Sequence, residues 1–128
     1  MVGLVVLSHS RKVIEGLMEL IEEMAQDVKV HGVGGTQDGA LGSDFEKTQQ
    51  AIEDAFTDEG VIVLFDLGST YMTAEMVIEG LSEEKKDKVK LVDAPLIEGG
   101  ITAAVSISAG MALEDVILSL EPLKIGKL

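Results

Sequence analysis

The sequence contains no cysteine and no tryptophan, and aromatic residues make up only 3% of its 128 residues. The absence of cysteine excludes disulfide bonds, thiolate nucleophiles and cysteine-based zinc or iron-sulfur sites. Only His9 and His31 remain as imidazole side chains. With 46% hydrophobic residues but so few aromatic ones, the core must be built from aliphatic side chains and methionine, which is common in α/β folds.

Basic residues are also scarce, because 10 lysines and arginines stand against 23 aspartates and glutamates, for a formal net charge of -13. A surface of this sign repels polyanions, so nucleic acid is not an expected partner. No apolar run approaches the roughly 20 residues of a membrane span, and Met1–Leu7 lacks the features of a signal peptide. We therefore expect a soluble cytoplasmic protein without a membrane partner, and its length predicts a single domain over residues 1–128.

Hydrophobic patterning predicts strands and helices in alternation, which is typical of a parallel sheet joined by right-handed crossovers. We predict a three-layer, doubly wound α/β domain with a four-stranded parallel sheet in the order 2-1-3-4. The expected strands are Val2–Leu7, Val28–Val33, Val61–Phe65 and Val89–Val92. The expected helices are Arg11–Gln26, Ser43–Thr57, Met72–Leu81, Glu98–Met111 and Leu113–Leu120.

Local signals mark several ends of these elements. Ser8 or Ser10 is expected to cap the first helix, and Ser43 with Glu46 has the spacing of a capping box for the second. The charged segment Glu83–Lys88 is interpreted as a solvated turn.

His9 directly follows the first predicted strand, and Asp66 directly follows the third. In a 2-1-3-4 sheet these strands are neighbours about 4.8 Å apart, so the two side chains meet at the carboxyl edge of the sheet. An aspartate there can accept a hydrogen bond from His9 Nδ1, which leaves the lone pair of Nε2 exposed as a nucleophile. The alternative is structural, with His9 beside a helix cap and Asp66 capping the helix after Ser69.

The composition narrows the chemistry open to this pair. A zinc or iron site needs at least three ligands, which two histidines and no cysteine do not readily supply, so neither a metal nor another cofactor is expected. The sequence has no Gly-x-Ser-x-Gly elbow, which argues against a Ser-His-Asp hydrolase. Attack of an imidazole on phosphorus remains, because a neutral imidazole forms a phosphoramidate that readily passes its phosphoryl group on.

The loops around His9 supply candidates for holding a phosphoryl group, namely Ser10, Arg11, Gly35, Thr36, Gly68 and Ser69. The helix after His9 offers backbone N–H groups to an anion, and Arg11 and Lys12 add positive charge. Arg11 is the only arginine, whereas phosphatases clamp phosphate with several, so the site is predicted to carry phosphate without hydrolysing it. Each of these groups also fits a structural role. Arg11 and Lys12 fit a solvated helical turn, Gly35 and Thr36 fit a plain flexible turn, and Ser69 fits a helix cap.

Two further features receive a structural interpretation. His31 lies inside the second predicted strand, at an edge of the sheet. The glycines between residues 32 and 39 do not form Gly-x-Gly-x-x-Gly, because Gln37 stands where the third glycine belongs, and no P-loop motif is present. Nucleotide binding by this chain is therefore not expected.

Four segments together resemble the DhaM family, the phosphoryl-carrier subunits of bacterial dihydroxyacetone kinases. They are Leu7-Ser8-His9-Ser10, Gly34-Gly35-Thr36 with Gly39 and Gly42, Asp66-Leu67-Gly68-Ser69, and Ala94-Pro95 with Glu98-Gly99. The resemblance covers the whole chain. The similar IIA domains of the mannose family of the phosphotransferase system usually have His-Gly after the first strand and Gly-Gly-Ser after the third, so Ser10 and Gly68-Ser69 favour DhaM.

The resemblance implies that His9 is phosphorylated on Nε2 by the phosphocarrier HPr, which enzyme I charges from phosphoenolpyruvate. It also implies transfer to ADP bound on the subunit DhaL, while DhaK holds dihydroxyacetone, with Asp66 as the orienting carboxylate. Some members continue into HPr-like and enzyme I-like domains, for which this chain is expected to depend on separate proteins. The family further implies a homodimer, for which one helix offers Ala103, Ala104, Val105, Ile107, Ala109 and Met111, unless that helix is buried within the chain.

Three other functions stay open at this point. The chain could serve as a mannose-family IIA subunit in sugar transport, or as an interaction domain with a vestigial pocket. It could also be a receiver-like signalling module phosphorylated on Asp66, although receivers need acidic residues after the first strand, where this sequence has Ser8-His9-Ser10.

Overall fold

The computed structural model describes all of residues Met1–Leu128 and contains one four-stranded parallel sheet in the order β2-β1-β3-β4. The predicted fold class and strand order are thereby confirmed. The strands are β1 (Gly3–Ser8), β2 (Val30–Gly34), β3 (Val61–Phe65) and β4 (Val89–Val92). The helices are α1 (Arg11–Met24), α2 (Phe45–Ala55), α3 (Gly68–Glu79), α4 (Glu83–Lys86), α5 (Leu96–Ser108) and α6 (Leu113–Leu120), followed by a 3-10 turn, η1 (Glu121–Leu123).

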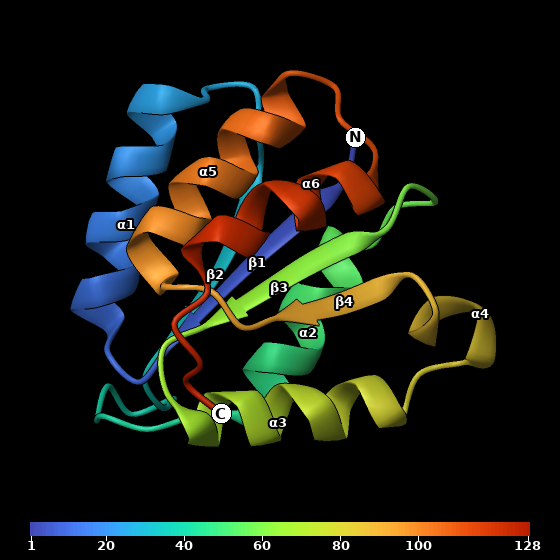
Figure 1. Ribbon diagram of the computed structural model, residues 1–128. Helices are drawn as coiled ribbons and strands as arrows, with labels where there is room; N and C mark the ends of the chain where they lie inside the picture. The colour runs from blue at the N-terminus through green and yellow to red at the C-terminus, as the bar shows by residue number, and fades with distance from the viewer.

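Helices cover both faces of the sheet, with α1, α5 and α6 on one face and α2 and α3 on the other (Figure 1). Leu4 and Val6 of β1 pack in the first core layer, and Val5 and Leu7 pack in the second. Because both faces are covered, β1 and β3 are almost continuously apolar rather than alternating. The two central strands are therefore held from both sides, which makes their carboxyl ends a firm base for a site.

The register of β1 and β3 determines what meets at that edge. Leu7 pairs with Phe65 in the ladder, and the Asp66 N–H continues it by donating to the Leu7 carbonyl oxygen at 3.1 Å. Ser8, His9 and Asp66 thus emerge side by side from the middle of the sheet, where the chain direction reverses between crossovers.

The N-cap of α1 is one of the two residues predicted for it, whereas the N-cap of α2 differs from the prediction. Ser10 caps α1, with its Oγ accepting from the Val13 N–H at 3.4 Å. The predicted capping box at Ser43 is wrong, because Asp44 is the N-cap of α2 and its carboxylate accepts from the Lys47 N–H at 2.9 Å. The Ser43 hydroxyl instead pairs with the Thr73 hydroxyl of α3 at 2.8 Å, which joins the starts of two helices.

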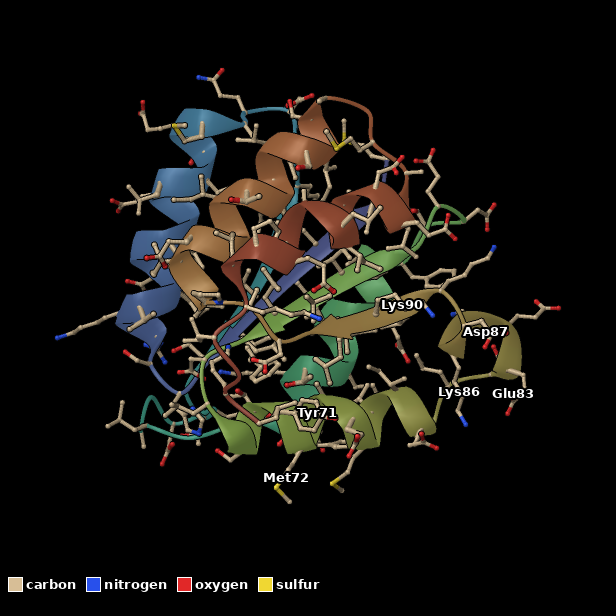
Figure 2. All side chains as sticks on the ribbon, in the orientation of Figure 1. Tyr71, Met72, Glu83, Lys86, Asp87 and Lys90 are labelled. Atoms are coloured by element: carbon tan, nitrogen blue, oxygen red, sulfur yellow. The ribbon has the colours of Figure 1, made fainter.

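Helix α3 begins at Gly68, four residues before the apolar pattern that predicted it. Its first turn, Gly68-Ser69-Thr70, is polar or small, so hydrophobic periodicity does not reveal it. Met72 and Met76 lie on the outer side of this helix with 63% of their surface exposed, and Figure 2 shows Met72 pointing away from the sheet. The turn expected over Glu83–Lys88 contains the short helix α4, which lies next to the start of β4 (Figures 1 and 2).

Helix α5 corrects the expected dimer surface. Ala103, Ala104 and Ile107 are at most 1% exposed, because α5 packs between α1 and α6 within the chain. Their small or slender side chains permit this close packing, and they are not free to meet a second copy. Only Val105, Ala109 and Met111 of the predicted set are exposed. No helix is both long enough and apolar enough to cross a lipid bilayer.

Candidate functional site

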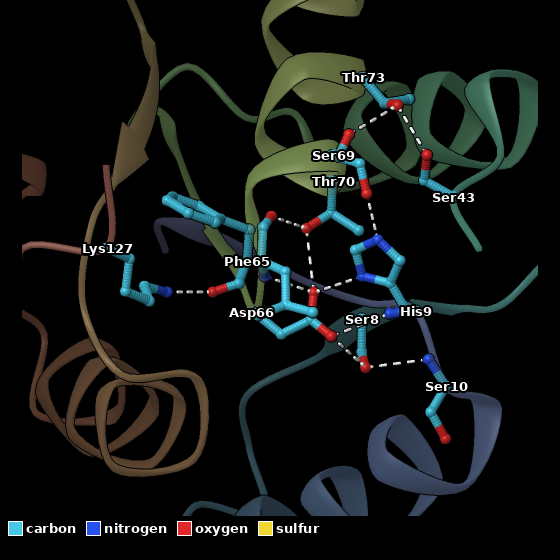
Figure 3. A network of polar contacts seen from close by, with 11 residues as sticks. Ser8, His9, Ser10, Ser43, Phe65, Asp66, Ser69, Thr70, Thr73 and Lys127 are labelled. Carbon is cyan, nitrogen blue, oxygen red and sulfur yellow. Dashed lines mark hydrogen bonds and ion pairs between the residues drawn. The ribbon is translucent and has the colours of Figure 1, made fainter. Parts of the chain in front are cut away.

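Asp66 is the centre of a dense polar network at the carboxyl edge of the sheet (Figure 3). Its Oδ2 accepts from the Ser8 hydroxyl at 2.8 Å and the His9 backbone N–H at 3.0 Å. Its Oδ1 accepts from the Leu67 N–H at 2.7 Å, the Thr70 hydroxyl at 3.0 Å and the His9 ring at 3.0 Å. Five donors therefore hold the carboxylate in one orientation.

These donors decide the ionisation of Asp66. Partial burial on its own raises the pKa of the carboxyl group, but the hydrogen bonds from the His9 N–H, the Ser8 hydroxyl and the His9 ring outweigh it and lower the pKa below its usual value. At neutral pH the carboxylate is therefore ionised, so it can accept hydrogen bonds but cannot donate one.

An ionised Asp66 fixes the tautomer of His9. Because Oδ1 cannot donate, the proton of the 3.0 Å contact must lie on His9 Nδ1, and the lone pair of the neutral ring is then on Nε2. The predicted contact between the two side chains is present. The His9 side chain keeps 22% of its surface exposed, so the imidazole lies at the surface of the protein.

Ser69 lies on the other side of the imidazole. Its hydroxyl contacts His9 Nε2 and, given the tautomer, donates to it. Ser69 belongs to the first turn of α3, whose leading backbone N–H groups have no acceptor within the helix. Gly68 and Ser69 therefore place the amino-terminal end of a 12-residue helix beside the free nitrogen of His9, an arrangement that favours an anion there.

The loop after β2 supports His9 rather than reaching Nε2 with free donors. Gly42 N–H donates to the His9 carbonyl oxygen at 3.0 Å. The Gly35 N–H donates to the Ser8 carbonyl oxygen at 3.1 Å, and the Thr36 hydroxyl donates to Asp38 and to the Ala40 carbonyl oxygen. In this arrangement the Gly35 N–H and the Thr36 hydroxyl already have acceptors within the chain, and their use as phosphoryl donors stays a prediction.

Gly34 and Gly35 are required by this packing. A Cβ on Gly34 would lie 2.6 Å from Arg11 Cα, so only glycine lets the start of α1 approach β2. Gly35 has a φ of +75°, a left-handed conformation that disfavours other residues.

The charged residues of the first turn of α1 remain in solvent. Arg11 is exposed, forms no ion pair, and lies against the loop, where a Cβ on Gly39 would be 3.3 Å from its guanidinium. Lys12 is likewise exposed, and the Ser10 hydroxyl is used as a cap. No group of three or more His, Asp or Glu side chains is arranged to hold a metal ion.

Sequence reasoning did not predict the bonds that Ser8, Thr70 and Lys127 make in this network. Ser8 is 2% exposed and receives the Ser10 N–H at 3.0 Å while donating to Asp66. Thr70 is 3% exposed and also donates to the Leu67 carbonyl oxygen. Lys127 reaches the Phe65 carbonyl oxygen from the far side of Asp66 (Figure 3). Ser8 lies inside a motif already noted and Thr70 directly follows another, whereas no local signal marks Lys127.

The sequence is similar to known proteins over most of its length. The family described as PTS system fructose IIA component, EIIA-man, matches residues 3–117. The chain is 37% identical over 121 residues to the phosphoryl donor subunit DhaM of PEP-dependent dihydroxyacetone kinase 2 of Listeria innocua, covering 94% of this chain and 97% of that protein. It is 34% identical over 125 residues to the phosphotransferase subunit DhaM of the PTS-dependent dihydroxyacetone kinase of Lactococcus lactis, covering 98% of each.

Solved structures share the fold. A crystal structure of a protein of unknown function is 35% identical, with a TM-score of 0.82 and 94% of each chain covered. The phosphotransferase system component EIIA from Streptococcus agalactiae matches with a TM-score of 0.70 at 17% identity, over 95% of this chain and 91% of that one. The second similarity concerns the fold alone.

Proposed function

Because the chain belongs to the EIIA-man family and to its DhaM members, we propose that it is the phosphoryl-carrier subunit of a phosphoenolpyruvate-dependent dihydroxyacetone kinase. The observation that carries the proposal is the contact of His9 Nδ1 with Asp66 Oδ1, which leaves Nε2 unprotonated at the start of α3. This arrangement suits an imidazole that attacks phosphorus. The protein acts as a phosphotransferase subunit through a phosphohistidine intermediate.

The first transfer is a displacement at phosphorus. The Nε2 lone pair of His9 forms the new N–P bond, the N–P bond to the imidazole of HPr breaks, and its electron pair returns to that ring. The His9 ring gains positive charge during this step, which the Asp66 carboxylate stabilises through Nδ1–H. In the second transfer an oxygen of the terminal phosphate of ADP, bound on DhaL, attacks the same phosphorus and His9 leaves as the neutral ring.

The start of α3 holds the phosphoryl group in this proposal. The Ser69 hydroxyl contacts Nε2 before phosphorylation, so it turns aside and donates to a phosphoryl oxygen once the N–P bond exists. The backbone N–H groups of Gly68 and Ser69 supply further donors, with the positive end of the helix dipole. Arg11 lies at the rim of the site and contributes charge to the approach of the group.

The partners follow from the same proposal. HPr donates the phosphoryl group, DhaL with ADP accepts it, and DhaK in the same complex holds dihydroxyacetone. The protein works as a homodimer whose surface excludes the buried residues of α5. Because phosphoenolpyruvate and ADP are metabolites of the cell interior, the proposal places the protein in the cytoplasm, with no cofactor of its own.

Two alternatives fit the site less well. A receiver needs a free aspartate oxygen as nucleophile, whereas five donors already engage both oxygens of Asp66. A mannose-type sugar-transport subunit shares the fold, but the relatives at 34 to 37% identity carry the name DhaM.

A labelling experiment tests the proposal. The purified protein is incubated with phosphoenolpyruvate, enzyme I and HPr, and the bond formed is tested with acid, alkali and hydroxylamine. We expect an acid-labile, alkali-stable adduct that is lost in His9→Gln and retained in His31→Gln. An alkali-labile, hydroxylamine-sensitive adduct that is retained in His9→Gln and lost in Asp66→Asn would establish the receiver instead, and no adduct at all would favour a passive interaction domain.

The final acceptor separates the kinase from sugar transport. Phosphorylated protein is mixed with DhaL loaded with ADP, with DhaK and dihydroxyacetone, and loss of label from His9 is followed with time. Rapid loss that requires both DhaL and ADP supports the carrier role. Retention of the label under these conditions contradicts it.

A further inference from the structure

Lys127 is a buried ammonium group directly behind the site. Only 13% of its side-chain surface is exposed. Its Nζ donates to the carbonyl oxygens of Phe65 and Ala94, the latter at 2.8 Å, and lies 4.0 Å from the centre of the Phe65 ring. Figure 3 shows Lys127 approaching the Phe65–Asp66 segment from the side opposite His9. The contact joins residues 62 positions apart in the sequence.

Burying this charge is costly, and the surroundings offset the cost. Burial lowers the pKa of Lys127, while Asp93 and Asp66 raise it, and the pKa stays below its usual value. Asp93 Oδ2 accepts the Lys127 backbone N–H at 3.0 Å, and its Oδ1, which has no hydrogen-bond partner, lies 3.9 Å from Nζ. A largely buried lysine held by two carbonyl oxygens, one carboxylate and an aromatic ring is a more specific arrangement than the anchoring of a tail requires.

The Phe65–Asp66 peptide connects Lys127 to the reacting residue. Lys127 contacts the carbonyl oxygen of this peptide, and the N–H of the same peptide donates to the Leu7 carbonyl oxygen of β1 at 3.1 Å. Donation to a carbonyl oxygen polarises the peptide and strengthens its own N–H donation. The ammonium thereby tightens the junction of β1 and β3 from which His9 and Asp66 emerge.

We propose that Lys127 is a positioning residue for phosphoryl transfer at His9, acting through the Phe65–Asp66 peptide that its ammonium group contacts. This inference rests on the proposed carrier function. When His9 carries a phosphoryl group, Asp66, Asp93 and the phosphoryl dianion lie in one region of a chain of formal charge -13. Lys127 opposes that accumulation from within the protein, where salt screens a charge least.

The test compares Lys127→Met with the matched control Lys124→Met. Lys124 belongs to the same segment, but its side chain is 41% exposed and its ammonium pairs only with Glu121, at 3.0 Å. We measure the rate of phosphoryl transfer from phospho-HPr, the titration of the Asp66 carboxyl carbon by 13C NMR, and the His9 tautomer by 15N NMR. In Lys127→Met we expect a rate about tenfold lower, a higher Asp66 pKa and less Nδ1–H tautomer, with Lys124→Met within twofold of the wild type.

A second pair of variants keeps the inference testable if Lys127→Met does not fold. Lys127→Gln keeps an N–H donor without the charge, and Lys127→Arg keeps the charge. The inference requires the Asp66 titration to move in Lys127→Gln and to stay near that of the wild type in Lys127→Arg. A lower melting temperature with unchanged Asp66 titration, tautomer and rate would overturn it and leave Lys127 as a structural anchor. If the wild type accepts no phosphoryl group, the proposed function fails, while the two NMR measurements still decide the role of Lys127.

Discussion

The two histidines of this chain lie on adjacent strands and have very different surroundings. His31 is within β2, paired in register with Val5, and is half-buried with no hydrogen bond to its ring. Burial, together with Lys29, lowers its pKa, and Asp54 opposes the change only in part. His9 lies just past the end of β1 and has a carboxylate on one ring nitrogen and a hydroxyl on the other.

The difference shows what the carboxyl edge of the sheet adds to a side chain. A histidine inside an edge strand meets only the neighbouring strand and the helices that pack on it. A histidine one residue beyond a central strand meets the end of the next strand and the start of the following helix as well. His9 obtains Asp66 from the first and Ser69 from the second, so the site is a product of topology more than of the imidazole itself.

Replacing the Asp66 carboxylate should have the largest effect on phosphoryl acceptance by His9. We expect Asp66→Asn to reduce the rate of phosphoryl acceptance by about 10²-fold or more, because an orienting carboxylate is lost and the amide allows the wrong tautomer. Asp66→Ala should also keep the fold and slow transfer. The rate is measured with phospho-HPr near pH 7, far above the lowered pKa of Asp66.

The matched control for this change is Asp87→Asn, at the C-cap of α4 and distant from the site. It should leave the rate within twofold of the wild type.

Because the folded pKa of Asp66 is depressed, the stability that this carboxylate contributes is present at neutral pH and is lost only as the pH falls through its folded pKa. If Asp66→Asn transfers at the wild-type rate, Asp66 has only a capping role.

Removing the Ser69 hydroxyl should slow phosphoryl acceptance less than replacing Asp66 does. We expect Ser69→Ala to slow phosphoryl acceptance about tenfold, the equivalent of one hydrogen bond worth roughly 1 to 1.5 kcal/mol. Stopped-flow transfer from phospho-HPr measures this rate. Ser108→Ala is the control. Ser108 is the exposed last residue of α5, and its hydroxyl bonds to Asp27 at 2.6 Å. A faster rate in Ser69→Ala would mean that the hydroxyl only blocks Nε2.

The smallest effect concerns His31. Its folded pKa lies below the ordinary value of 6.5, so the stability gained from its neutral form is complete above about pH 6.5 and declines as the pH falls. Between pH 7.5 and 5.5 the wild type should lose a few tenths of a kcal/mol that His31→Gln does not lose, because a half-exposed group is well solvated. Urea unfolding at both pH values measures the difference. An identical pH dependence in both proteins would show that burial of His31 carries no energetic cost.

The central part of the site was predictable because it depends on strand order. Val2–Leu7 and Val61–Phe65 are visible as apolar runs, and the 2-1-3-4 order makes them neighbours, so His9 and Asp66 must meet. The capping of α2 was less determined, since Ser43 and Asp44 both suit an N-cap and the choice depended on a partner in α3. Similarly, the small residues of α5 fit a dimer surface or an internal helix contact, and only packing distinguishes the two.

Lys127 illustrates what sequence reasoning could not reach. Its contacts are with Phe65, Ala94 and Asp93, which are at least 33 positions away. Nothing in the sequence near Lys127 separates it from the exposed Lys124. The bonding within the loop after β2 was out of reach for a related reason, because Gly35 and Thr36 bond to atoms whose positions depend on how the loop folds back.

His9 and Asp66 emerge from the two innermost strands, which are among the segments of a protein that open least often. Their spacing therefore stays the same whether a donor or an acceptor is docked. In the proposed carrier role, the pair would then need no rearrangement between exchanges beyond the turn of the Ser69 hydroxyl. Mutations that alter the proposed transfer without touching the site should therefore act on the association and dissociation rates of the partner proteins.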